Sequence, residues 1–273
     1  MRTSADPIEE RAFTSSGIVT LTTDFGLVDP YVGIVHGVIL SRAPGARVVD
    51  LCHEIPPQDV ARASFFLAHA RGYFPPGTVH VAVVDPGVGS SRRLVVALDR
   101  GQAFLAPDNG LLAPVLSVDA RVRALDTARF ALPRQSRTFH GRDVLAPAAA
   151  AIAGGLDPLA AGVGPDLPLE RSALPRARLD GDRGEAEVLF ADRYGNLVLA
   201  ARSEDLGDDP TSWIVETHGL ILRVRGTYAD VAPGEALALV DSYGSLEIAV
   251  RDGNAAQRLG LVRGDRVNLR RII

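Results

Sequence analysis

Residues 81–93 read V-A-V-V-D-P-G-V-G-S-S-R-R, an apolar run that ends at a carboxylate and a turn. The apolar part is long enough for one buried strand, and it stops at Asp85. In open α/β sheets ligands bind beyond the carboxyl ends of the strands, so Asp85 has the position of a functional residue. Gly87 and Gly89 free the backbone for a close turn, which could bring Arg92 back over the same crevice. The alternative is a plain D-P-G turn with Arg92 as a solvated surface charge.

Strands and helices alternate through the first half of the chain. This alternation predicts βαβ units, and therefore a mainly parallel sheet sandwiched by helices. Asp29 is expected to cap the first helix and Pro30 to occupy its first position. The expected strands are 17–23, 47–52 and 79–84, with shorter ones at 94–98 and 103–106, and the expected helices are 30–41, 58–73 and 144–153.

Beyond residue 184 the helical spacing disappears and short strands separated by turn signals take over. This pattern of short strands and turns predicts a small β-barrel or sandwich of about 90 residues. The expected organisation is an N-terminal α/β domain over 17–160, a linker rich in Gly and Pro over 161–184, and a smaller C-terminal β-barrel domain over 185–273. The expected strands of the second domain are 185–190, 197–200, 213–216, 220–224, 237–241, 246–250 and 267–271.

Composition excludes several classes of function. The formal net charge is −4 and no basic block occurs, which argues against nucleic acid as a partner. No lysine occurs, so neither a Schiff-base lysine nor a phosphate-loop lysine is available. No apolar stretch reaches the ~18 residues of a membrane span, and the acidic N-terminal segment is unlike a signal peptide, so the cytoplasm is the expected location. The single cysteine, Cys52, is expected to be a buried structural thiol.

Four motifs, taken together and in this order, resemble one known family. They are T-T-D-F-G at 22–26, V-D-P-G-V-G-S-S-R at 84–92, T-F-H-G-R-D at 138–143, and D-R-Y-G-N at 192–196 followed by S-L-E-I-A-V-R-D-G-N-A-A at 245–256. The set is similar to that of the S-adenosylmethionine hydroxide adenosyltransferases, also called S-adenosylmethionine hydrolases. Those enzymes are relatives of the halogenases that make 5′-fluoro- or 5′-chloro-deoxyadenosine.

The resemblance implies a fold, an assembly and a reaction. The fold is an α/β domain followed by a β-barrel, and the assembly is a homotrimer with active sites between the N-domain of one subunit and the C-domain of the next. In the reaction, water attacks the 5′ carbon of S-adenosyl-L-methionine in line with the sulfonium, giving adenosine and L-methionine. Because sulfonium is already a good leaving group, no cofactor, metal or general acid is expected, and the protein has only to position a water and accept its proton.

The catalytic set that the resemblance implies falls on Asp85, Arg92 and His140. Asp85 would orient the water, and His140 would take up or relay its proton. Arg92 would pair with Asp85 and fix its direction, since a guanidinium holds a carboxylate in one plane. Without the resemblance, His140 can equally be a structural histidine at the start of a helix.

Substrate-binding residues carry over in the same way. Asp24 would accept both ribose hydroxyls, and Asp29 and Asp192 would bind the methionine ammonium. Ser242 would contact the methionine carboxylate. Asn196 and the backbone near Asn254 and Ala255 would contact the polar edge of the adenine. Tyr228 is a candidate for stacking on the face of the adenine.

Several positions depart from the patterns of these relatives. The halogenases have serine where this chain has Gly141 and tyrosine where it has Asp85, and a carboxylate repels halide but not water. They also tend to carry arginine at Tyr243, and the family tends to carry T-N-I where this chain has L-A-A at 199–201. Many members have lysine at His36, to which we assign no role beyond a helix surface.

Three alternative functions remain at this stage. One is a halide-dependent 5′-halo-5′-deoxyadenosine synthase, and another is a nucleoside-binding protein without turnover. The third is a metal-dependent hydrolase, although the spacing of its candidate ligands matches no known metal motif. Those candidate ligands are Asp24, His53, Glu54, Asp85, Asp108 and His140.

Overall fold

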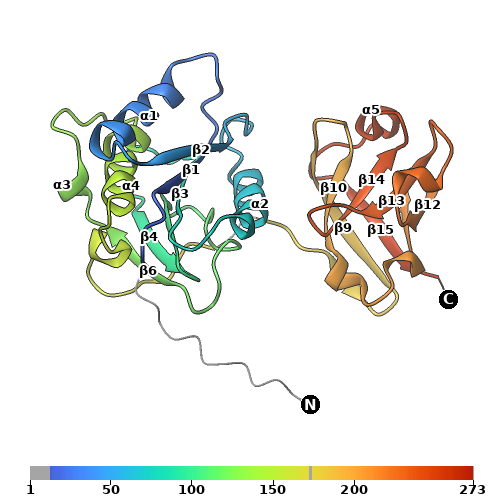
Figure 1. Cartoon of the computed structure of the whole chain (residues 1–273). Coiled ribbons are helices and arrows are strands. Elements are labelled where there is room, and N and C mark those ends of the chain that lie inside the picture. The colour runs from blue at the N-terminus through green and yellow to red at the C-terminus, as the bar shows by residue number, and fades with distance from the viewer. Residues whose placement is uncertain (1–12, 172–173, 273) are drawn as a thin grey trace. The chain divides into compact units, whose positions relative to one another are not determined.

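The structure is a computed structural model that describes residues 13–171 and 174–272. The chain divides into two compact units, one up to residue 173 and the other from residue 174 onward (Figure 1). Among the described residues, no helix is both long enough and apolar enough to cross a lipid bilayer.

A seven-stranded mixed sheet forms the centre of the N-terminal unit. In spatial order its strands are β2 (Arg47–Cys52), β1 (Ile18–Thr23), β3 (Val79–Val83), β5 (Gln102–Pro107), β4 (Leu94–Asp99), β6 (Arg121–Leu125) and β7 (Gly162–Val163). The first four strands run parallel to one another, and β4, β6 and β7 add antiparallel pairings. The expected α/β fold with a mainly parallel sheet is therefore confirmed. Sequence analysis missed β6 and β7, although the R-V-R-A-L alternation of β6 is typical of a half-buried strand.

Helices cover both faces of this sheet, as expected. Alternate strand residues point to opposite faces, so Leu21 packs with α1 (Tyr31–Arg42) and α4 (Ala146–Ala153), while Phe104 packs with α2 (Val60–Ala70). Figure 1 shows α1 and α4 on one side of β1 and β3, and α2 on the other. A fourth, short helix, α3 (Thr127–Phe130), follows β6.

The expected cap of the first helix is wrong. The N-cap residue of α1 is Pro30 and no side chain caps the helix, because Asp29 lies one position too early to reach the first amides. For α2, helical spacing predicts Phe66 on the apolar face, and Phe66 is partly buried against the core, but Phe65, which we did not expect there, is more deeply buried at 2% exposed. Helical spacing alone could not choose between two adjacent phenylalanines.

Cys52 is partly buried, so the expected buried thiol is also wrong. It is the last residue of β2, which is the edge strand of the sheet. An edge strand has a neighbour on one side only, and for that reason its end is less well covered than a central strand.

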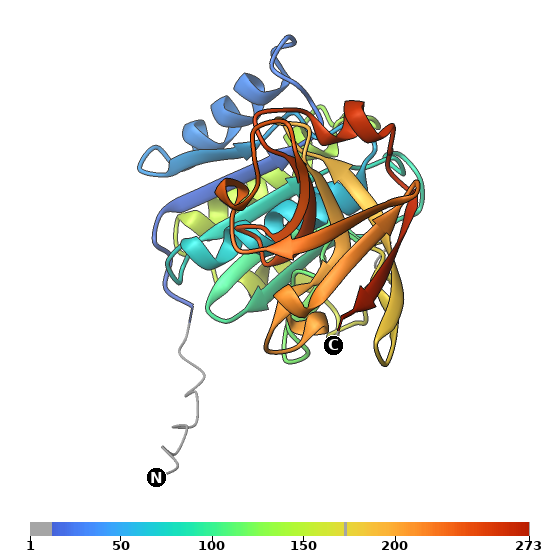
Figure 2. The same cartoon turned by 90° about the vertical axis from the view of Figure 1, so that its right-hand side faces the viewer.

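The C-terminal unit is a closed barrel, which confirms the expected β-barrel (Figure 2). In order around the barrel its strands are β9 (Arg183–Ala191), β10 (Leu197–Arg202), β14 (Ser245–Val250), β13 (Ala236–Val240), β12 (Leu220–Arg225), β11 (Trp213–Thr217) and β15 (Arg266–Arg271). Pairing of β9 with both β15 and β10 closes the barrel, and this closure leaves no free sheet edge in the ring. A short strand, β8 (Arg178–Asp180), pairs with β9 from outside the ring. Inward-facing residues such as Leu197, Leu246 and Val215 fill the interior.

Short elements complete the two units. The helix α5 (Ala255–Leu259) follows β14 and was not expected from the sequence. Within the segment 161–184, for which we expected a linker, the described residues include β7 and β8.

Candidate active site

The turn that follows β3 brings Arg92 back onto Asp85. The backbone N–H of Val88 donates to the carbonyl of Asp85 at 3.2 Å, and Ser90 Oγ donates to the carbonyl of Gly87 at 2.7 Å. Ser90 Oγ in turn accepts the backbone N–H of Arg92 at 3.2 Å. These bonds compact the segment, and the side chains at its two ends meet.

Asp85 and Arg92 form a bidentate ion pair. Arg92 Nε donates to Asp85 Oδ1 at 3.0 Å and to Oδ2 at 2.8 Å, and Arg92 Nη2 also contacts Oδ2. The side chains are shielded, with exposed fractions of 11% for Arg92 and 7% for Asp85. Arg92 is therefore not a solvated surface charge. Its planar fork fixes the plane of the carboxylate.

Arg92 also contacts His140, with 2.8 Å between Nη2 and Nδ1. A guanidinium can only donate, so Nδ1 is the acceptor and the neutral imidazole carries its proton on Nε2. Burial lowers the pKa of His140 below its usual value of 6.5, and the positive charge of Arg92 lowers it further. The neutral imidazole is thus the form favoured at neutral pH.

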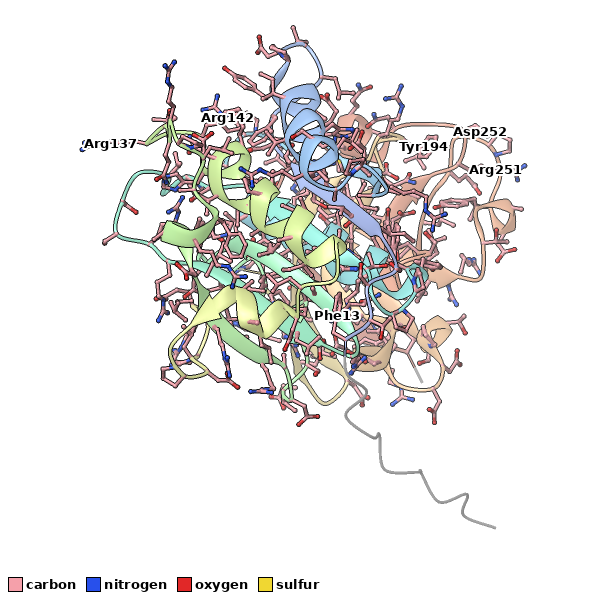
Figure 3. The ribbon with its side chains drawn as sticks, turned by 60° about the vertical axis from the view of Figure 1, so that its left-hand side comes forward. Phe13, Arg137, Arg142, Tyr194, Arg251 and Asp252 are labelled. Carbon is pink, nitrogen blue, oxygen red and sulfur yellow. The ribbon has the colours of Figure 1, made fainter. Side chains whose placement is uncertain are left out.

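An ion pair with a buried carboxylate anchors the segment that carries His140. Asp143 is fully buried, accepts from Arg142 Nε at 2.5 Å and accepts the backbone N–H of Ser136 at 2.6 Å. Figure 3 shows Arg137 and Arg142 on this segment, which leads into α4. Gly89 has φ +82°, and a Cβ there would lie 3.0 Å from the carbonyl of Arg137. Glycine therefore permits the close approach of the two segments that carry Arg92 and His140.

Three aromatic rings lie beside this group. Phe25, Tyr31 and Phe139 meet edge to face, with ring centroids 5.4 to 6.1 Å apart. Phe139 precedes His140, and Phe25 follows Asp24. Edge-to-face packing is a favourable arrangement of such rings. Sequence analysis missed this cluster because its members are far apart in the chain.

Gly141 is tightly enclosed. A Cβ at this position would lie 3.1 Å from Val83 Cγ1 and 3.3 Å from Phe25 Cζ. Both neighbours belong to the packed region around the end of β3, so a larger residue here would have to displace them.

Asp24 lies next to the strand that carries Asp85, because Thr23 pairs with Val83 in the β1–β3 ladder. Asp24 Oδ2 accepts the backbone N–H of Gln58 at 2.8 Å, which leaves Oδ1 and a second lone pair of Oδ2 for a ligand. Asp29 is exposed in the loop before α1.

The second unit groups the other candidate residues around two neighbouring turns. Asp192 Oδ1 accepts the backbone N–H of Asn196 at 2.8 Å, and Asn196 itself is buried. The backbone N–H of Ala256 donates to the carbonyl of Gly195 at 2.9 Å, so this turn lies against the start of α5, where Asn254 is the N-cap residue. Figure 3 shows Tyr194 and Asp252, which belong to these turns, at the same end of the unit.

The close approach of the two turns depends on Gly195. It has φ +85°, and a Cβ there would lie 2.1 Å from the side chain of Asn254. The buried Ala255 then follows Asn254 at the first position of α5. The structure thus brings Asn196, Asn254 and Ala255 together.

A buried carboxyl that sequence analysis missed lies close by. Tyr228 Oη donates to Glu247 Oε1 at 2.8 Å, and Glu247 is 3% exposed. Burial raises the pKa of Glu247 to about 7, and the charges of Asp241 and Asp192 add to the increase. Asp192, Tyr228 and Glu247 therefore lie near Asp241, which precedes the exposed Ser242. The only signal for Glu247 in the sequence was a charged residue within an otherwise apolar strand.

The metal cluster considered from the sequence is not assembled. Asp108 accepts from Arg93 Nη2 at 2.6 Å and from the backbone N–H of Glu170 at 2.9 Å, and Asp85 pairs with Arg92. Within residues 13–171 and 174–272, the group with the geometry to bind a metal is His36, Asp50 and His53, of which only His53 was a candidate.

Comparison with known proteins places these residues in a family. Residues 19–162 match the SAM hydroxide adenosyltransferase N-terminal domain, and residues 186–268 match the C-terminal domain of the same family. The chain belongs to the SAM hydroxide adenosyltransferase family. The resemblance stated from the four motifs is thus confirmed.

Named relatives and solved structures are similar over nearly the whole length of this adenosyltransferase. An (R)-S-adenosyl-L-methionine hydrolase of Thermus thermophilus is 46% identical over 261 residues, covering 92% of this chain and 98% of that protein. A protein of the same name from Salinispora tropica is 44% identical, covering 92% and 97%. A fluorinase of Actinopolyspora mzabensis is more distant, at 25% identity with 94% and 98% covered. The crystal structure of an uncharacterized conserved protein from Thermotoga maritima superposes with a TM-score of 0.83 at 34% identity, covering 93% of this chain and 100% of that one.

Proposed function

We propose that this chain hydrolyses S-adenosyl-L-methionine to adenosine and L-methionine. A bond forms between the oxygen of water and C5′, and the bond between C5′ and sulfur breaks. The electron pair of that bond stays on sulfur as the neutral thioether of methionine, and one proton is released. The similarity to two proteins named (R)-S-adenosyl-L-methionine hydrolase supports this reaction. The names of those relatives make the R configuration at sulfur the one to test first.

The observation that carries the proposal is the contact of Arg92 with both Asp85 and His140. Arg92 occupies one side of the Asp85 carboxylate and leaves lone pairs that can accept a hydrogen bond from water. An acceptor held in one plane orients the water, and its negative charge stabilises the positive charge that develops on the attacking oxygen. We expect Asp85 to be the catalytic acceptor and Arg92 to position it.

His140 has a more limited part in this proposal than the sequence suggested. Its Nδ1 accepts from Arg92, and the neutral ring then carries a proton on Nε2. His140 can take up the proton of the water only at Nδ1, and this requires that its contact with Arg92 break first. We therefore place any relay through His140 after the bond to C5′ has formed.

The remaining site residues fit the parts of the substrate by their chemistry. Asp24 offers oxygens that suit a pair of ribose hydroxyls, and the group of Asn196, Asn254 and Ala255 combines amide and backbone polar atoms that suit an adenine edge. Asp192 offers a carboxylate for the methionine ammonium, Ser242 a hydroxyl for the methionine carboxylate, and Tyr228 a ring for stacking on the adenine. Asp29 is the weakest assignment because it is exposed and contributes no cap.

A halide-dependent synthase is the less favoured alternative. Asp85 is a carboxylate where the halogenases carry tyrosine, and a carboxylate next to the entering nucleophile repels an anion. Gly141 lacks the serine hydroxyl of the halogenases, and its surroundings leave little room for one.

A nucleoside-binding protein without turnover would need the same pocket but not the catalytic contacts. The bidentate pair of Asp85 and Arg92 is shielded from solvent. Burying an ion pair has a desolvation cost that a binding site for a neutral nucleoside does not require. This cost favours an enzyme.

Three further features of the proposal come from the family resemblance and the sequence. We expect a homotrimer because the family resemblance implies one, and light scattering during size-exclusion chromatography measures its mass. We expect no cofactor, and turnover that survives a strong chelator would agree with a reaction that needs no metal. The cytoplasm stays the predicted location.

The decisive experiment is an analysis of products. Purified protein is incubated with the R and the S sulfonium epimers separately, each with and without chloride, and the mixtures are resolved by chromatography. The proposal predicts adenosine and methionine in equal amounts whether or not chloride is present. Formation of 5′-chloro-5′-deoxyadenosine would overturn the proposal. Binding of the substrate with no turnover of the R epimer and none of the S epimer would also overturn it.

A further inference from the structure

Two histidines and an aspartate that have no part in the proposed reaction meet beside β2. They are His36 on α1, Asp50 on β2, and His53 immediately after β2. Nε2 of His36 lies 2.8 Å from Asp50 Oδ1, and Nε2 of His53 lies 2.9 Å from the same oxygen. One donor atom from each residue lies within 4.8 Å of the other two.

His53 is the least exposed member, and one of its ring nitrogens lacks a hydrogen bond. The residue is 4% exposed, and its Nδ1 lies 2.8 Å from Thr23 Oγ1. Within the described residues its Nε2 has no hydrogen bond of good geometry, although Asp50 Oδ1 is only 2.9 Å away. A buried nitrogen without a partner is costly and calls for an explanation.

A hydrogen-bonded triad is the simplest alternative, and it accounts for only half of the geometry. His36 Nε2 makes a proper hydrogen bond to Asp50 Oδ1. His53 Nε2 makes no such hydrogen bond. A simple hydrogen-bonded triad therefore does not explain why His53 Nε2 lies 2.9 Å from Asp50 Oδ1. A cation in front of the three atoms would accept the lone pair of His53 Nε2 and neutralise the carboxylate at the same time.

We propose that His36, Asp50 and His53 bind one divalent transition-metal ion. The donor atoms of His36 and His53 lie 2.8 and 2.9 Å from Asp50 Oδ1, and all three lie within 4.8 Å of one another, close enough for one ion with ligand bonds of ~2.0–2.1 Å to contact them after small side-chain movements. Two imidazoles with one carboxylate suit ions such as Zn²⁺ or Co²⁺, whereas Mg²⁺ and Ca²⁺ prefer oxygen ligands. The contact of His53 Nδ1 with Thr23 Oγ1 is the kind of support that orients a metal-bound imidazole.

The ion would tie together three segments of the N-terminal unit. His36 comes from α1, Asp50 from β2, and His53 from the loop after β2. The carbonyl of His53 accepts the backbone N–H of Gly26 at 2.8 Å. Thr23 and Gly26 flank Asp24. The site is therefore structural. None of its three ligands is one of the proposed catalytic residues, and its occupancy can be measured without any substrate.

Metal binding is tested by calorimetry on the full chain after removal of metals with a chelator and desalting. Titration of the wild type with ZnCl₂ is expected to show one ion per chain, and CoCl₂ is expected to give visible absorption bands of the bound ion. MgCl₂ and CaCl₂ at the same concentrations are expected to give no saturable binding. The variants His36→Gln and Asp50→Asn are expected to lose at least about tenfold in Zn²⁺ affinity.

Matched controls separate this site from other histidines and carboxylates. Glu54→Gln changes an exposed carboxylate next to His53, and His140→Ala removes the imidazole of the proposed active site. Both are expected to keep wild-type stoichiometry and affinity. Should a ligand variant fail to fold, X-ray absorption of the Zn²⁺-loaded wild type replaces it, with two imidazole nitrogens expected in the coordination shell. Absence of stoichiometric binding to the wild type, unchanged affinity in both ligand variants, or a shell without two imidazoles would overturn the proposal.

Discussion

Nη2 of Arg92 lies 2.8 Å from Nδ1 of His140, and the same guanidinium holds both oxygens of Asp85. One arginine therefore links the two residues proposed to handle the water and its proton. Because arginine only donates, this contact fixes the acceptor nitrogen of His140 and opposes protonation of its ring. The consequences can be measured in the dependence of turnover on pH and in the effects of substitutions.

The first prediction concerns pH. Burial and the charge of Arg92 lower the pKa of His140 below 6.5, so the ring stays neutral at pH values where a free histidine would be charged. If turnover requires neutral His140, the fall of kcat at low pH should have its midpoint below pH 6.5. In Arg92→Met the fall should begin at higher pH, because the positive charge is gone. A midpoint above pH 6.5 in the wild type would contradict this account.

Asp85→Asn should abolish most turnover with little effect on binding. The amide keeps the size of the side chain but loses the negative charge that stabilises the attacking water, so we expect kcat to fall by at least ~10²-fold. The Kd of a non-reactive substrate analogue, measured by calorimetry, should change little. Asp166→Asn, which breaks exposed ion pairs to Arg121 and Arg123, serves as the control and should keep wild-type kcat. A near-normal kcat in Asp85→Asn would remove the carboxylate from the mechanism.

Gly141→Ser should destabilise the protein without creating halide transfer. The added Cβ would lie 3.1 Å from Val83 Cγ1, and overpacking of this kind costs about 1–3 kcal/mol. Gly141→Ala carries the same Cβ without the hydroxyl and should lose similar stability in urea denaturation. Chlorinated nucleoside formed by the serine variant, but not by the alanine variant, would show that the hydroxyl alone selects the nucleophile.

Glu247 should make the stability of the protein depend on pH. Its pKa in the folded protein is about 7, against 4.5 as the ordinary value, mainly because the carboxyl is buried. Between these values the folded state binds more protons than the unfolded state, so stability falls as pH rises from about 4.5 to 7, by at most ~1.4 kcal/mol per pH unit. Glu247→Gln should reduce this slope in urea denaturation at pH 5, 6 and 7. Identical slopes for the two proteins would contradict the raised pKa.

Much of the fold was predictable because its signals are local. The apolar runs of β1, β2 and β3 and the turn residues between the barrel strands mark these elements without reference to the rest of the chain. Sequence analysis did not predict two kinds of feature. The strand β6 and the edge strand β7 are short and partly exposed, and the choice of Phe65 over Phe66 as the more buried residue depends on packing partners that are distant in the chain.

The proposed catalytic residues could be predicted from local sequence motifs. Residues whose place in the site depends on tertiary packing could not. Asp85, Arg92 and His140 each lie in a motif, and the structure brings them into contact. Phe25, Phe139 and Glu247 also lie in quoted motifs, but we assigned them no role, because the ring contacts with Tyr31 and the burial of Glu247 depend on how strands and helices pack.

A single turnover in ¹⁸O-labelled water, with enzyme in excess over S-adenosyl-L-methionine, tests the central claim most directly. If water held by Asp85 attacks C5′, the 5′ oxygen of the adenosine formed carries ¹⁸O from the first turnover. If instead the carboxylate of Asp85 attacks C5′ and the resulting ester is hydrolysed at its carbonyl carbon, the first adenosine carries ¹⁶O and Asp85 gains the label. The account predicts labelled adenosine and unlabelled Asp85, and the reverse distribution would contradict it.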